Sequence, residues 1–146
     1  MADAASLHGY VPIDDGLWDL YRRSHALLHV SFTEGVPQVL LEAFAARLPS
    51  VATAVGGVPF LVGDAGWLIP PSDAGAAADA LAEVVSDEAE RVERVTRATE
   101  TARRYTLEAE CARLAAFLRP TADARAGSAS EAAGGRTRRR RRRTRR

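Results

Sequence analysis

Short apolar runs alternate with a helical segment over the first seventy residues, and this order constrains the fold more than any other feature. The runs at residues 26–30 and 50–55 are flanked by turn residues and are predicted to be buried strands. Residues 38–48 lie between them and have the apolar spacing of a helix, and a third strand is predicted at residues 67–69. The pattern therefore predicts an α/β fold with a parallel sheet.

The segments around this core predict shorter elements. Residues 17–21 have the spacing of a short amphipathic helix, with Asp14 or Asp15 as its N-cap. Residues 56–59, Gly-Gly-Val-Pro, predict a loop. The later part of the chain has helical periodicity, and helices are predicted there at residues 77–85, 88–105 and 107–118.

Charge is divided unevenly along the chain. Residues 1–120 contain 10 Arg and 17 Asp and Glu, a net charge of −7, whereas residues 121–146 contain 10 Arg and two acids, a net charge of +8. Residues 121–135 are mostly Ala, Gly and Ser, which cannot bury a core, and residues 136–146 hold nine Arg. We therefore predict a partial globular domain at residues 1–120, followed by a disordered linker and an Arg-rich tail at residues 121–146.

Several classes of protein are excluded by what the sequence lacks. A single cysteine, Cys111, excludes a disulfide framework, and this residue is predicted to be packed and inert on its helix. Because no apolar run reaches the roughly 18–20 residues of a membrane span and no signal peptide is recognised, we predict a soluble cytoplasmic protein. His25 and His29 are predicted to have core or edge roles, since further ligands are lacking, and no metal site is predicted.

Two polar residues interrupt the otherwise apolar helix predicted at residues 38–48. Leu40, Phe44 and their neighbours make most of its circumference apolar, so this helix is expected to be largely buried. Gln38 and Glu42, four residues apart, form the polar strip in its middle. Because burying an unpaired carboxylate is costly, Glu42 must have a structural partner or face a ligand cavity.

Glu34 lies in the loop before this helix, eight residues ahead of Glu42. Gly35 lets a ligand approach the exposed amides of the helix start, which favour phosphate. Gly56 and Gly57 follow the next strand and are expected at the same carboxyl edge of the sheet, where ligands bind in open α/β folds. Two interpretations remain open: a site for a phosphate-bearing ligand with hydroxyl groups, or a solvated loop carboxylate and a structural one.

A series of motifs occurs in the same order as in a known family. The motifs are Glu34-Gly35-Val36-Pro37, Glu42-Ala43, Leu48-Pro49, Val55-Gly56-Gly57-Val58-Pro59 and the segment from Asp64 to Pro71. The series resembles the C-terminal, donor-binding domain of GT-B glycosyltransferases of the group 1, or family 4, type, and the likeness extends from about Gly9 to Leu118. This resemblance implies a partial Rossmann-like domain, the C-terminal half of the GT-B fold.

The resemblance also implies a function. Members of this family are retaining enzymes that transfer a glycosyl group from a nucleotide-sugar to an acceptor, so a UDP- or GDP-sugar is the expected substrate, with no cofactor or metal; the acceptor is not identified. Glu34 is the expected catalytic residue, in contact with hydroxyl groups of the donor sugar, and Glu42 is expected to bind the ribose. The other donor-binding residues that the resemblance implies are Ser31, Gly35, Val36, Pro37, Gln38, Gly56 and Gly57.

Departures from the family pattern limit this expectation. The acceptor domain is not recognised, so the chain is expected to be inactive alone, and a chain that supplies the N-terminal half is a candidate partner. Phe60 stands where Glu is usual and Arg47 where Gly is frequent, and we expect both to distort the ligand edge. The alternative is a degenerate, non-catalytic fragment whose basic tail binds nucleic acid or a protein partner, although the tail has no aromatic residue to stack on bases.

Overall fold

The structure is a computed structural model and describes residues 4–119. Contacts divide the chain into two compact units, with the boundary between Tyr105 and Thr106. The linker and Arg-rich tail predicted at residues 121–146 lie outside the described residues. The domain boundary expected at Pro120 therefore stays a prediction.

The described part of the second unit is a single helix. It runs over residues 107–119 and confirms the helix predicted at 107–118. Thr106 caps it, because the Thr106 Oγ1 accepts a hydrogen bond of 3.3 Å from the amide of Ala109. The prediction that Cys111 is packed is wrong, since its side chain is exposed, as are most others on this helix.

Three parallel strands form the sheet of the first unit, in the order β1-β2-β3. They are β1 (Leu27–His29), β2 (Ser50–Thr53) and β3 (Trp67–Ile69). Val51 of the central strand pairs with Leu28 on one side and Trp67 on the other. The predicted parallel sheet is confirmed, although β1 and β2 are shorter than the sequence pattern predicts.

Helices connect the strands and cover the sheet. In chain order they are the short 3-10 helix η2 (Ile13–Asp15) and the α-helices α1 (Leu17–Arg23), α2 (Gln38–Ala45), α3 (Val58–Val62), α4 (Ala74–Ser86) and α5 (Glu88–Arg104). Asp73 and Asp87 cap α4 and α5, since their carboxylates accept hydrogen bonds from the amides of Ala76 and Glu90 at 2.8 and 2.9 Å. The cap at Asp73 explains why α4 begins at Ala74, earlier than predicted.

Two local predictions are wrong. Residues 58–62 form the short helix α3, where the Gly-Gly-Val-Pro sequence predicts a loop. Pro59 lies in the first turn of α3, where a proline is tolerated because its missing N–H would have no helical partner. The N-cap of α1 is Gly16, with a φ of 99°, whereas Asp14 and Asp15 lie in η2.

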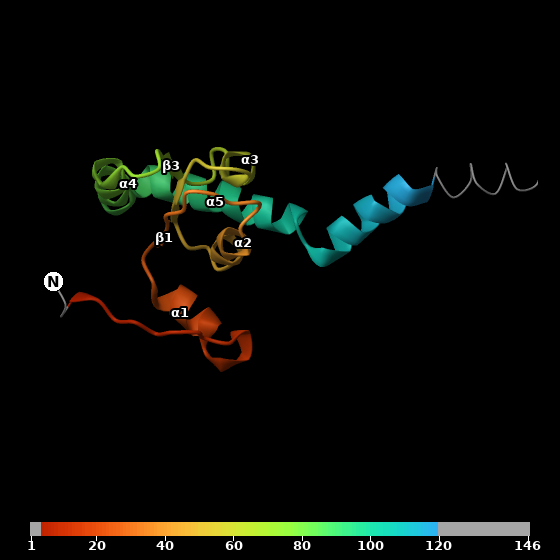
Figure 1. Cartoon of the computed structure of the whole chain (residues 1–146), viewed down its shortest axis with the longest axis horizontal. Coiled ribbons are helices and arrows are strands. Elements are labelled where there is room, and N and C mark those ends of the chain that lie inside the picture. The colour runs from red at the N-terminus through yellow and green to blue at the C-terminus, as the bar shows by residue number, and fades with distance from the viewer. Residues whose placement is uncertain (1–3, 120–146) are drawn as a thin grey trace, which may run out of the picture. The chain divides into compact units, whose positions relative to one another are not determined.

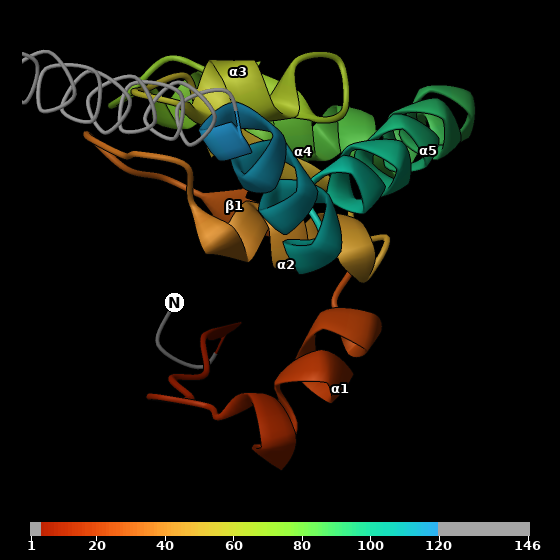
Figure 2. The same ribbon diagram turned by 90° about the vertical axis from the view of Figure 1, so that its right-hand side faces the viewer.

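Helices cover both faces of the sheet (Figure 1 and Figure 2). On one face, α2, α3 and α5 enclose Ala52 in a cluster that includes the fully buried Leu40 and Phe44. On the other face, α4 packs against Val51 and Ile69. Helix α1 lies on the side of α2 away from α3 and packs against α2 (Figure 2). This packing fixes β1 and β2, and with them the loops that follow these strands.

Candidate functional site

The loops that follow β1 and β2 meet at the carboxyl edge of the sheet. The Gly57 amide donates a hydrogen bond of 2.9 Å to the carbonyl of Gly35. Gly56 has a φ of 53° and lies so close to Glu34 that a Cβ there would be 1.9 Å from the Glu34 carbonyl oxygen. A Cβ on Gly57 would be 2.3 Å from the Gly35 carbonyl oxygen. The two predicted glycine motifs are therefore in direct backbone contact, which requires residues without side chains.

Ser31 and Thr53 join the ends of the same two strands. The Ser31 amide donates to the Thr53 Oγ1 at 2.9 Å, and the Thr53 hydroxyl donates to the Ser31 carbonyl at 2.8 Å. This reciprocal pair continues the strand pairing beyond the last residue of β1. Thr53 was not among the predicted site residues, although a polar residue that ends a buried apolar strand is a signal that could have found it.

The Glu34 carboxylate is held by two side chains from the end of β1. Its Oε1 accepts a hydrogen bond of 2.7 Å from the Ser31 hydroxyl and lies 3.0 Å from the His29 Nε2. The side chains of His29 and Glu34 are 18% and 24% exposed, so the pair is shielded from most solvent. His29 was predicted to have a core or edge role; it ends the edge strand β1 and lies against the predicted catalytic carboxylate. These contacts fix the orientation of Glu34.

Glu42 is paired with a tyrosine that sequence reasoning missed. The Tyr21 hydroxyl of α1 donates a hydrogen bond of 2.8 Å to the Glu42 Oε2. Burial raises the pKa of Tyr21 well above its ordinary value, and the hydrogen bond and the negative charge of Glu42 raise this pKa further. Tyr21 therefore stays protonated and donates to Glu42 at neutral pH. The cost of partly burying this carboxylate is thereby reduced.

This pair predicts how stability depends on alkaline pH. Above the ordinary tyrosine pKa of 10.0, the unfolded chain releases the Tyr21 proton whereas the folded chain keeps it. Well above pH 10.0 the free energy of unfolding should therefore fall by about 1.4 kcal/mol per pH unit because of Tyr21. Below pH 10.0 the full contribution of Tyr21 to stability is present. Tyr21→Phe should lose about 1 kcal/mol at neutral pH and show the shallower alkaline decline. Urea unfolding of the wild-type and Tyr21→Phe chains from pH about 8 to about 11 measures the difference in stability and the slope of the alkaline decline. Equal slopes in the two proteins would contradict this prediction.

The other predicted donor-binding residues lie around the start of α2. Gly35 and Val36 are exposed, Pro37 is buried as the N-cap residue, and Gln38 is exposed in the first turn. No side chain caps this end of α2. Gln38 lies one turn before Glu42, as predicted. The helix start therefore presents backbone amides beside the Glu34 loop, an arrangement that suits an anionic group.

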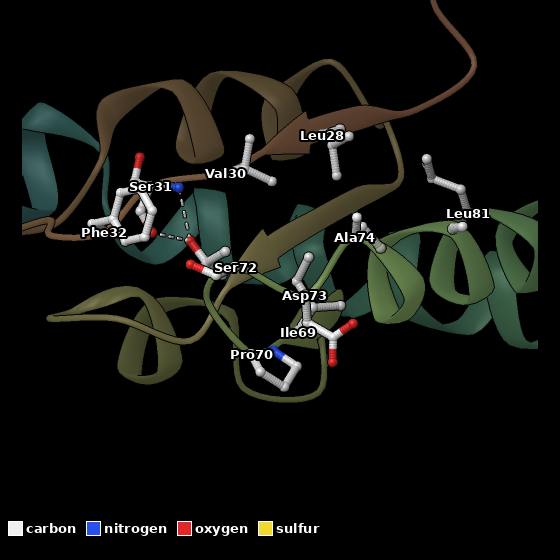
Figure 3. Close-up of a pocket in the computed structure, with 13 residues that line it drawn as sticks. Leu28, Val30, Ser31, Phe32, Ile69, Pro70, Ser72, Asp73, Ala74 and Leu81 are labelled. Carbon is white, nitrogen blue, oxygen red and sulfur yellow. Dashed lines mark hydrogen bonds between the residues drawn. The ribbon is translucent and has the colours of Figure 1, made fainter.

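A mostly apolar pocket of about 540 Å³ adjoins this edge (Figure 3). Leu28 and Val30 line it from β1 and the residues after it, and Leu81 lines it from α4. Ser31 and Phe32 line the part nearest the Glu34 loop. The sequence did not predict this pocket, because its walls come from segments whose spacing depends on tertiary packing.

The structure places Phe60 and Arg47, which were expected to distort the ligand edge, at different positions; the effect of Phe60 stays a prediction, whereas Arg47 lies away from that edge. Phe60 is 80% exposed on α3, and the contacts of Gly56 and Gly57 form in its presence. Arg47 lies near Pro49, which precedes β2, and so belongs to the amino edge of the sheet, opposite the Glu34 loop.

Neither a metal centre nor a membrane-spanning helix is found among the described residues. Residues 4–119 contain no group of three or more His, Cys, Asp or Glu side chains placed to hold a metal ion. Within the same residues, none of the helices combines the length and apolarity needed to cross a bilayer. The cytoplasmic location stays a prediction from the sequence.

Comparison with known proteins decides the family. The family described as "Glycosyl transferases group 1" matches residues 1–104, about seven-tenths of the chain. The chain belongs to the group 1 glycosyltransferases. The predicted resemblance is thereby confirmed, and the α/β, Rossmann-like fold agrees with it.

Individual relatives agree with this family. The chain is 32% identical over 100 residues to O-antigen chain mannosyltransferase B of Escherichia coli, covering 68% of this chain and 26% of that protein. It is 34% identical over 100 residues to D-inositol 3-phosphate glycosyltransferase of Corynebacterium glutamicum, covering 67% and 24%. The structure of sucrose-phosphate synthase from Thermosynechococcus elongatus superposes with a TM-score of 0.65 at 29% identity, covering 72% and 27%. The chain thus spans about a quarter of the length of these proteins.

Proposed function

We propose that the chain forms the donor-binding edge of a retaining glycosyltransferase that uses a nucleotide-sugar, UDP- or GDP-linked. The observation that carries this proposal is the contact between the Glu34-Gly35 loop and the Gly56-Gly57 turn beside the start of α2. This contact gathers a fixed carboxylate and the uncapped start of α2 at the edge where ligands of open α/β folds bind. Family membership supports the same function.

Each part of this edge has a proposed partner on the donor. The amides at the start of α2 would face the diphosphate, because the helix dipole and the uncapped N–H groups favour anions. Glu34 is the proposed catalytic residue and would accept hydrogen bonds from hydroxyl groups of the sugar. Its Oε1 is taken by Ser31 and His29, so the Oε2 is the atom proposed to meet the sugar.

Glu42 is proposed to bind the ribose of the nucleotide. The Tyr21 hydroxyl donates to its Oε2 and fixes the carboxylate, and the Oε1 is the proposed acceptor for a ribose hydroxyl. Charge-assisted hydrogen bonds of this kind are about twice as strong as neutral ones, so the contact would add substantially to nucleotide affinity.

Calorimetric titration of the whole chain with UDP and GDP and their sugar conjugates tests the role of Glu42. We expect one nucleotide to bind and Glu42→Ala to weaken that binding by about tenfold or more, since the ribose loses a charged acceptor. About 0.3 M salt screens attraction to the Arg-rich residues 136–146. Glu83→Ala, which removes an exposed carboxylate on α4, is the matched control. An equal effect of the two substitutions would contradict the assignment.

Transfer to an acceptor is proposed to need segments beyond the described residues, so that these residues alone bind the donor without turnover. Strand β1 pairs only with β2 among the described strands; Leu28 within it is 42% exposed, and Val30 just after it is 61% exposed. Parallel sheets are normally covered on both faces. We propose that another part of a glycosyltransferase, on this chain or on a partner chain, covers β1 and the apolar pocket.

A further inference from the structure

Two residues after the end of helix α2 lies an arginine whose backbone conformation favours glycine. Arg47 has a φ of 60°. Its amide donates to the Phe44 carbonyl at 3.1 Å, and the Leu48 amide donates to the Ala43 carbonyl at 2.8 Å, the pair of hydrogen bonds that ends many helices in a left-handed residue. Glycine is the usual residue at this position, because a Cβ is disfavoured there. Strained residues of this kind cluster at ligand sites.

Arg47 lines a surface pocket at the amino edge of the sheet. The pocket has a volume of about 370 Å³. Ser24 and His25 line it just before β1, Pro49 just before β2, and Arg91 from α5. This edge is opposite the one that carries the Glu34 loop. The pocket therefore brings two arginines and a histidine together from three segments.

The charge in this pocket is not balanced by acidic side chains. None of the residues that line it is Asp or Glu, although residues 1–120 carry a net charge of −7. The Arg91 Nη1 donates to the Val84 carbonyl at 2.7 Å, which fixes the guanidinium without neutralising it. The next two arginines along α5 each pair with a glutamate one turn earlier. Among the described residues, neither Arg47 nor Arg91 forms such an ion pair.

We propose that this pocket binds a phosphate-bearing anion through Arg47 and Arg91, with His25 and Ser24 as further hydrogen-bond partners. Guanidinium groups present paired N–H donors that match the oxygens of a phosphate, and two of them suit a doubly charged group. The volume admits a phosphate or a pyrophosphate group. The site is independent of the donor edge, since it uses other residues at the opposite edge of the sheet. A free phosphate compound and a phospholipid headgroup share this chemistry.

The substitution Arg47→Gly separates binding from stability. Because glycine is favoured at a φ of 60°, this variant should unfold at a temperature about 4 °C higher than the wild-type chain. The same variant should bind inorganic pyrophosphate about tenfold more weakly, measured by calorimetry in about 0.3 M salt. Arg103→Gln, which removes an exposed arginine outside the pocket, should leave the affinity unchanged. A loss of binding in a more stable protein cannot result from unfolding.

Two arms of the experiment identify the source of the phosphate group. Binding of pyrophosphate that depends on Arg47 assigns a free phosphate compound. Binding only to vesicles that contain an anionic phospholipid, again dependent on Arg47, assigns a headgroup. Equal affinity of the wild-type and Arg47→Gly chains in both arms, or no binding in either, would overturn the proposal.

Discussion

Replacing Gly56 with alanine is expected to destabilise the first unit by about 3 kcal/mol and to abolish ligand binding at the carboxyl edge. Gly56 has a φ of 53°, and a Cβ there would lie 1.9 Å from the carbonyl oxygen of Glu34 and 2.9 Å from its carbonyl carbon. Both neighbours are backbone atoms, which cannot move aside as a flexible side chain can. The Glu34 loop must therefore shift, and the carboxylate that it carries shifts with it.

Gly16→Ala is the matched control for this prediction. Gly16 also has a positive φ, 99°, but a Cβ there would meet no atom within 4 Å. Gly16→Ala should therefore lower the free energy of unfolding by only about 1 kcal/mol, the cost of placing a Cβ at a positive φ, and the variant should keep its ligand affinity. Urea denaturation gives both free energies of unfolding. Equal losses at the two positions would show that the backbone contact between the loops is not formed.

Glu34→Gln is expected to lower affinity for the sugar conjugate of the bound nucleotide by about tenfold or more, while affinity for the free nucleotide changes by less than about twofold. The substitution keeps the size of the side chain and an oxygen for Ser31, but it removes the charge that strengthens hydrogen bonds from sugar hydroxyls. Calorimetric titration with the nucleotide and its sugar conjugate measures the two affinities.

The control for Glu34 is Glu93→Gln, which removes an exposed carboxylate paired with Arg97 on α5. This variant should bind both compounds as the wild-type chain does. If Glu34→Gln weakened the nucleotide and its conjugate equally, Glu34 would not contact the sugar, and its role would be to support the loop.

The sheet was predictable because each strand is a short apolar run between turn residues. The run at residues 26–30 gave β1, and the small and β-branched residues at 50–55 gave β2. The helix α3 was not predictable in the same way, because it has only five residues, follows Gly57 and contains Pro59 in its first turn, and both residue types are typical of loops. Its helical form depends on Leu61 and its neighbours packing into the core.

The loops of the candidate site were predictable because the topology of parallel strands brings them to one edge. Their backbone contact at Gly56 agrees with that expectation. The partners of the two glutamates were not predictable from spacing. Tyr21 reaches Glu42 only because α1 packs against α2, and this packing follows from tertiary structure. Likewise, the position of His29 beside Glu34 depends on how the loop after β1 turns back.

The most direct test of the proposed function is calorimetric titration of the whole folded chain with UDP, GDP and their sugar conjugates in about 0.3 M salt. We predict that one nucleotide binds saturably, that its sugar conjugate binds more tightly than the free nucleotide, and that this binding persists when residues 121–146 are deleted. A folded chain that binds none of these compounds, or whose binding disappears with residues 121–146, would contradict a donor-binding role.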